Sequence, residues 1–125
     1  MLINAIPQYI QNITNAKVDL TSTNATTFYT APSGAEFNAS IVSSILVSED
    51  SGNSDTITIT ITNGSTVFSV FKVAAVGANA TVELLTHSLV LQGGEILKVQ
   101  AATANRLHVV ASVQEYAQNR STTAL

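Results

Sequence analysis

Side chains with carboxylate or amide oxygens lie close together in the loop of residues 50–55, at Asp50, Asn53 and Asp55. Carboxylate and amide oxygens at this spacing resemble the ligands of a calcium-binding loop. An EF-hand loop also needs a glycine at its sixth position and a glutamate at its twelfth, and this stretch has neither. Because Asp and Asn also hydrogen-bond their own backbone in turns, we predict an ordinary hairpin loop and no metal site.

The two histidines, His87 and His108, are too few for a zinc site without carboxylates or thiolates at matching positions. His108 alternates with apolar residues, so it should face outward, either as a plain surface imidazole or within a pH-sensitive interface. The eight carboxylates leave a glycosidase-type acid pair open. The sequence has no Gly-x-Ser-x-Gly elbow, glycine-rich phosphate loop or His-Glu-x-x-His motif. We therefore predict a protein that is not an enzyme and holds no cofactor.

The segment from Thr56 to Phe71 gives the strongest structural signal. Threonine and isoleucine alternate strictly up to Thr62, which is typical of a half-buried strand, and Asn63-Gly64 is typical of a type I′ hairpin turn. This turn would place Thr62 opposite Ser65 and Ile59 opposite Phe68. The hairpin would then bury Ile57, Ile59, Ile61, Phe68 and Val70 on one face, and carry Thr56, Thr58, Thr60, Thr62, Val67, Ser69 and Phe71 on the other.

The rest of the sequence alternates short strands with turn signals at intervals of about 8–12 residues. We expect strands at residues 16–20, 26–30, 36–48, 56–62, 65–73, 80–85, 88–91, 95–101 and 107–116. In the long strand 36–48, one face should carry Ile41, Ser43, Ile45 and Val47, and the other Val42, Ser44 and Leu46. No apolar stripe of helical period occurs, so the predicted class is all-β: a jelly-roll-like antiparallel β-sandwich of about eight strands with an extended N-terminal arm.

Composition limits the partners that the chain can bind. Charged residues make up 10% of the chain, against about 25% in most soluble domains, and the five basic residues are scattered. Nucleic acid, whose phosphates need clustered Lys or Arg, is therefore excluded as a partner. No apolar run approaches the ~20 residues of a membrane span, and the first ten residues lack the basic segment of a signal peptide. We expect no membrane partner and synthesis in a cytoplasm.

The predicted organisation is an arm at residues 1–16, a β-sandwich domain at 17–117 and a polar tail at 118–125. A lone sandwich would leave apolar side chains uncovered on the arm and on the threonine-rich face. Burying an aliphatic side chain contributes about 1.5–3 kcal/mol, and ordering the backbone costs about 1–2 kcal/mol per residue, so docking could roughly offset the ordering of the arm. The arm would dock on a neighbouring subunit or, alternatively, pack on its own sandwich or stay disordered. The expected contacts are Ile3, Ile6, Tyr9 and Ile10 in the arm and Val67, Phe71 and Val73 on the face.

Several segments together carry a resemblance to a known group of proteins. Thr26–Gly34 reads Thr-Thr-Phe-Tyr-Thr-Ala-Pro-Ser-Gly, Gly77–Leu85 reads Gly-Ala-Asn-Ala-Thr-Val-Glu-Leu-Leu, and Leu89–Ala101 contains Leu-Gln-Gly-Gly-Glu-Ile-Leu-Lys-Val. With the closing strand Leu107–Tyr116, they resemble small β-sandwich structural proteins of tailed bacteriophages. The resemblance covers most of residues 17–116. It implies assembly as homotrimers or larger rings.

The resemblance implies a non-enzymatic virion structural protein of a tailed phage. We expect a capsid decoration or cement subunit that binds itself, as a trimer, and other virion proteins such as the major capsid protein. The alternatives are a neck, tail or fibre accessory and a host-surface module that binds carbohydrate. Against the last alternative, Phe28 and Tyr29 are adjacent in a strand, so they point to opposite faces and form no stacking platform for a sugar.

Overall fold

The structure, a computed structural model, describes residues 10–118. This part of the chain contains strands and no helix, which confirms the predicted all-β class. The strands are β1 (Ile10–Asp19), β2 (Thr26–Thr30), β3 (Phe37–Glu49), β4 (Asp55–Thr62), β5 (Val67–Val76), β6 (Thr81–Glu83), β7 (Leu89–Gln92), β8 (Ile96–Ala101) and β9 (Leu107–Gln118).

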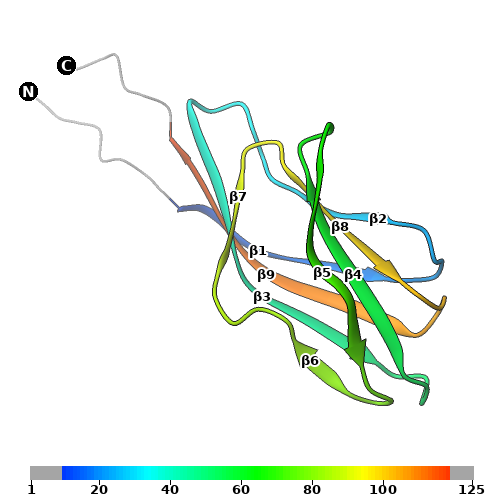
Figure 1. The fold of residues 1–125 in the computed structure, drawn as a ribbon. Helices are drawn as coiled ribbons and strands as arrows, with labels where there is room; N and C mark the ends of the chain where they lie inside the picture. The colour runs from blue at the N-terminus through cyan, green and yellow to red at the C-terminus, as the bar shows by residue number, and fades with distance from the viewer. Residues whose placement is uncertain (1–9, 119–125) are drawn as a thin grey trace, which may run out of the picture.

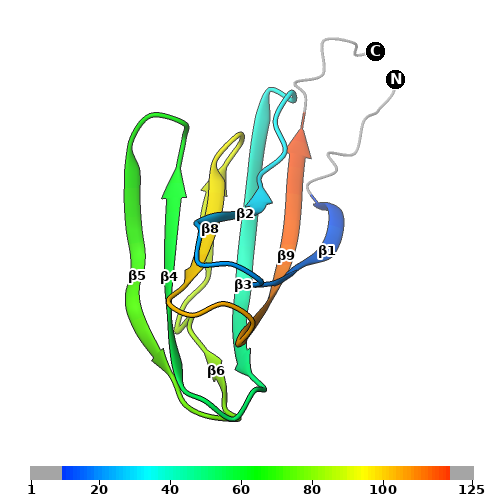
Figure 2. The ribbon, with the colours of Figure 1, turned by 90° about the vertical axis from the view of Figure 1, so that its right-hand side faces the viewer.

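The strands form two antiparallel sheets, which we name the first and the second sheet. The first sheet has the order β1-β9-β3-β6, with β7 also paired to β3, and the second has the order β2-β8-β4-β5. Figure 1 shows the two layers, and in Figure 2 β4 and β5 lie on one side of the molecule while β3, β9 and β1 lie on the other. The predicted β-sandwich is therefore confirmed, and both β1 and β5 are edge strands.

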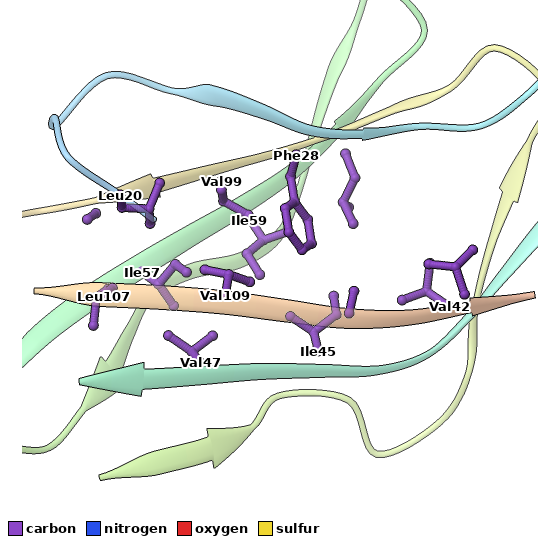
Figure 3. Packing of buried hydrophobic residues seen from close by; sticks show 14 of the residues in the cluster. Leu20, Phe28, Val42, Ile45, Val47, Ile57, Ile59, Val99, Leu107 and Val109 are labelled. Atoms are coloured by element: carbon purple, nitrogen blue, oxygen red, sulfur yellow. The ribbon is translucent and has the colours of Figure 1, made fainter. Parts of the chain in front are cut away.

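The core fills the space between the two sheets. Strand alternation turns Ile57 and Ile59 of β4 toward Val47 and Val109 of the first sheet, as Figure 3 shows. Phe28 is the aromatic side chain in this core. The buried hydrophobic side chains are Leu20, Phe28, Ala31, Val42, Ile45, Val47, Ile57, Ile59, Val76, Leu91, Leu97, Val99, Ala101, Leu107, Val109, Ala111 and Val113.

The β4–β5 connection differs from the predicted type I′ turn. Asn63 lacks the positive φ that such a turn needs. Its Oδ1 instead accepts the N–H groups of Ser65 and Thr66, at 3.0 and 3.3 Å. The connection therefore has four residues, and Thr62 pairs with Val67 rather than with Ser65.

Two bulges in β5 then change which of its side chains face the core. Ile59 pairs with Phe71 and Ile57 with Ala74, so β5 holds an extra residue in two places. A one-residue bulge turns the following side chains to the opposite face. Phe71, which we predicted on the outer face, therefore packs against the core. Phe68 pairs with Ile61 ahead of both bulges, so it lies on the predicted face, but it is 56% exposed rather than buried.

A bulge at Ser43 has the same effect in β3. The register shifts between Val42 and Ser44, so Val42 lies on the same side of the sheet as Ile45 and Val47, and all three are buried. The predicted grouping of Ile41 with Ile45 and Val47 is therefore wrong. Leu46 does lie on the face opposite Ile45 and Val47, as predicted, and it is 39% exposed whereas they are buried.

The beginning of β1 and the end of β9 lie side by side at one end of the sandwich, where Ile10 pairs with Tyr116. Residues 10–16, which the sequence analysis assigned to the arm, thus belong to the first sheet. Ile3, Ile6 and Tyr9 lie outside the described residues, as do residues 119–125 of the predicted tail.

Candidate interaction surface

Within residues 10–118, the large apolar side chains that remain exposed lie in two groups. One group is on β5, the edge strand of the second sheet, and the other is on the outer face of the first sheet. Exposed apolar patches of this kind mark interaction sites on soluble proteins. The exposed large hydrophobic residues are Val67, Phe68 and Val73 on β5, and Ile13, Leu46, Val90 and Val110 on the first sheet.

The β5 group contains two of the three contact residues that we predicted on the sandwich. Val67 is 62% exposed and Val73 is 59% exposed. Val73 lies at a bulge with a φ of 54°, a left-handed conformation that β-branched residues rarely adopt. Its N–H donates to Thr58 Oγ1 of β4 at 3.1 Å, which holds the bulge against the sheet. Phe71, the third predicted contact, lies on the core side of the same strand.

The group on the first sheet was missed by sequence reasoning. Val110 lies directly opposite Leu46, and Ile41 lies directly opposite Val90, on the face that points away from the core. The sequence signal is an apolar residue at an outward position of a strand whose inward positions are already apolar, as at Val110. That signal becomes readable only once strand register is known.

The loop between β3 and β4 is organised by a buried glutamate at the end of β3. Glu49 accepts N–H groups from Ser51 at 2.8 Å, Asn79 at 2.9 Å and Gly52 at 3.1 Å, and also accepts the Ser51 hydroxyl. Burial raises the pKa of Glu49, but these hydrogen bonds outweigh burial and lower the pKa to about 2. The carboxylate thus joins this loop to the turn before β6, a role that the sequence pattern did not reveal.

His108 faces outward, as predicted. Its Nε2 lies 3.2 Å from Asp19 Oδ1 and its Nδ1 lies 3.5 Å from Asp50 Oδ2, so the two carboxylates flank opposite sides of the ring. A single metal ion could not use both carboxylates together with one ring nitrogen in this arrangement. Between residues 10 and 118, no group of three or more His, Cys, Asp or Glu side chains is placed to hold a metal ion.

A hydrogen-bonded cluster joins the two sheets at the end where β1 begins. The Tyr29 hydroxyl of β2 bonds Ser40 Oγ of β3 at 2.9 Å and donates to Glu115 Oε2 of β9. Glu115 Oε1 accepts from Asn12 Nδ2 of β1 at 3.1 Å. Burial raises the pKa of Tyr29, and the hydrogen bond to Glu115 raises it further, to about 12. The cluster therefore fixes the start of β1, next to the predicted arm, against both sheets.

The described residues contain no helix long and apolar enough to cross a membrane.

No protein-family model matches the chain, and no curated protein sequence matches it. Among solved structures, two crystal structures of a pentameric capsid protein isolated from metagenomic phage sequences are similar to it. Each shares 18% sequence identity with this chain over 90% of its length, with a TM-score of 0.48. The matched region covers 66% of one of those chains and 68% of the other. The chain thus spans about two thirds of the length of these capsid proteins.

Proposed function

We propose that the protein is a non-enzymatic structural protein of tailed-phage particles, whose copies attach to one another and to the particle through exposed apolar surface. The observation that carries the proposal is the grouping of the exposed large apolar side chains on β5 and on one sheet face. A soluble monomer would expose these side chains to water, whereas neighbouring subunits would bury them.

The composition of the surface supports the same proposal. With only 10% charged residues, many outer positions of the strands carry Thr, Ser, Asn or Gln, such as Thr56, Thr58 and Thr60 of β4. Uncharged polar side chains do not repel identical copies, and they form hydrogen bonds readily at interfaces that trap water. The resemblance of the strand segments to small β-sandwich proteins of tailed phages supports the class of particle.

Within that class, we propose a capsid decoration or cement subunit that assembles as a trimer and binds the major capsid protein. The proposed contacts are Ile3, Ile6 and Tyr9 of the arm, Ile10 at the start of β1, and Val67 and Val73 of β5. Phe71 supports the β5 contacts from the core side. Repetition by symmetry would let weak contacts add through multivalency.

The experiment removes residues 2–9, which leaves every strand of the sandwich intact. In particles assembled from cells that supply only this shortened protein, quantitative mass spectrometry should find the subunit missing. Deletion of residues 119–125 is the matched control and should leave incorporation unchanged. Normal incorporation of the arm deletion would contradict the role of the arm. The copy number of the full-length protein per particle tests whether it belongs to the capsid, because a cement protein is present in hundreds of copies and a neck or fibre protein in far fewer.

A further inference from the structure

The outer face of the first sheet is built from residues that strand register aligns in rows across four strands. Each row crosses the sheet through one residue each of β1, β9 and β3, which are directly paired with their neighbours in the row. The row ends at a residue of β6 or β7, because both of these strands pair with the same edge of β3. The first of two rows that matter here contains Lys17, Val110, Leu46 and Glu83, and the second contains Ile13, Gln114, Ile41 and Val90.

The row of Lys17 carries opposite charges at its two ends. Lys17 is exposed on edge strand β1, and no ion pair joins it to another residue between positions 10 and 118. Glu83 is exposed at the other end, on β6. Burial raises the pKa of Glu83, but hydrogen bonds from Ser44 Oγ and the N–H groups of Ile45 and Leu85 outweigh burial and lower the pKa. Glu83 is therefore negatively charged at neutral pH.

The centre of this row is apolar. Val110 and Leu46 are paired directly and are each 39% exposed. In the row of Ile13, the residues at the two ends are apolar, with Ile13 72% exposed and Val90 56% exposed. The row of Lys17 thus runs from a positive end through an apolar middle to a negative end, while Asp19, two positions along β1 on the same face, lies beside His108 with its Oδ1 3.2 Å from Nε2.

Such a face is complementary to itself under one particular symmetry. The axis is a two-fold that lies in the plane of the interface, parallel to the strands and midway between β9 and β3. It places each row over the same row of the second copy, in reverse order. It would place Lys17 over the partner's Glu83, Val110 over the partner's Leu46, and Ile13 over the partner's Val90. We propose that the outer face of the first sheet binds a second copy of this chain in this arrangement. The inference rests on the proposed self-association and adds a two-fold contact on the first sheet to the trimer contacts proposed for the arm and β5.

The opposite two-fold axis, which runs across the strands, fits poorly. Centred between the two rows, it would place Lys17 over the partner's Ile13 and Glu83 over the partner's Val90. Each charge would then lose water against an apolar side chain without gaining an opposite charge, which is costly. Opposite charges across the interface therefore select the axis along the strands.

The size of the face is sufficient for a specific contact. Four strands spaced by about 4.8 Å and eight residues per strand at about 3.4 Å give a patch of roughly 500 Å² per copy. About 1,000 Å² in total lies at the lower limit of specific interfaces. We therefore expect a dimer that dissociates on dilution.

Cross-linking tests the symmetry directly, because the natural chain has no cysteine. Ile13→Cys and Val90→Cys introduce single thiols at well-exposed positions, and the two proteins are mixed with a short bifunctional maleimide. The mixture should form a linked dimer, whereas each variant alone should not, because identical positions would lie about 14 Å apart across three strand spacings. A mixture of Ile13→Cys with Lys17→Cys tests the axis that runs across the strands, which would bring these two positions together. This mixture should not form a linked dimer. Linking in that mixture alone would overturn the proposed symmetry.

A charge reversal tests the surface. Lys17→Glu should weaken the dimer by roughly tenfold or more in sedimentation equilibrium, because it places two carboxylates together. Lys72→Glu, on exposed β5, is the matched control and should have no effect on this contact. Equal effects of the two reversals would overturn the inference.

Three further outcomes bear on this inference and on the proposed function. A dimer that Val67→Asp dissociates, while Ile13→Cys and Val90→Cys fail to link, would place self-association on β5 and overturn only the inference. A protein that stays monomeric at every concentration would overturn both. A linked dimer whose full-length chain is absent from purified particles would refute the virion role and leave the dimer standing.

Discussion

Replacement of Tyr29 by phenylalanine tests whether the hydrogen-bonded cluster holds the two sheets together. The substitution removes one oxygen and leaves no cavity, so its effect isolates the lost hydrogen bonds. Ser40, 2.9 Å from the Tyr29 hydroxyl, is 0% exposed and would be left without this partner. Leaving a buried polar group unpaired costs about 1–3 kcal/mol. For a domain of this size, that loss corresponds to a decrease in Tm of roughly 4–12 °C.

Urea unfolding followed by circular dichroism measures this loss, at one fixed protein concentration because self-association adds to apparent stability. Tyr116→Phe is the matched control, since within residues 10–118 its hydroxyl bonds only Gln114, two residues away on the same strand, at 2.9 Å. We expect less than about 0.5 kcal/mol from the control, in the range of most surface changes. The double variant Tyr29→Phe/Ser40→Ala should recover part of the loss, because it removes both partners of the bond. Equal losses for Tyr29→Phe and Tyr116→Phe would refute the role of the cluster.

Two other substitutions test features of the loops and of β5. Glu49→Gln should lower the free energy of unfolding at neutral pH, and that free energy should then change less as the pH falls. Because the pKa of Glu49 is lowered from 4.5 to about 2 in the folded state, its contribution is present above pH 4.5 and is lost as the pH falls toward 2; urea unfolding across this range measures the difference from the natural protein. Val73→Asn should raise the free energy of unfolding by about 1 kcal/mol, because asparagine tolerates the left-handed φ of 54° better than valine does. Val67→Asn, on the same strand and without positive φ, is the control and should give no such gain in thermal unfolding.

The sequence predicts the strands well because alternation is a local signal. The run from Thr56 to Thr62 fixes which isoleucines face the core of β4, and Ile57 and Ile59 are buried as expected. The bulges have no comparable signal in the amino-acid sequence. No glycine or proline stands at Ser43 or Val73, yet the extra residues there decide that Val42 and Phe71 pack inward.

The candidate surface is harder to predict than the strands. Lys17, Val110, Leu46 and Glu83 lie far apart in the sequence, and only the register of four strands places them in one row. Sequence reasoning found Val67 and Val73, because the hairpin around them is local. The contacts predicted for Ile3, Ile6 and Tyr9 remain predictions.

The pairing of Ile10 with Tyr116 has a mechanical consequence. Because β1 and β9 are antiparallel neighbours, a force pulling these two positions apart acts across the strands. Their hydrogen bonds would then break one pair at a time, as in a zipper, rather than together in shear. Tension applied between Ile10 and Tyr116 would therefore open the first sheet at low force, and a subunit under load is better anchored through only one of these two strands.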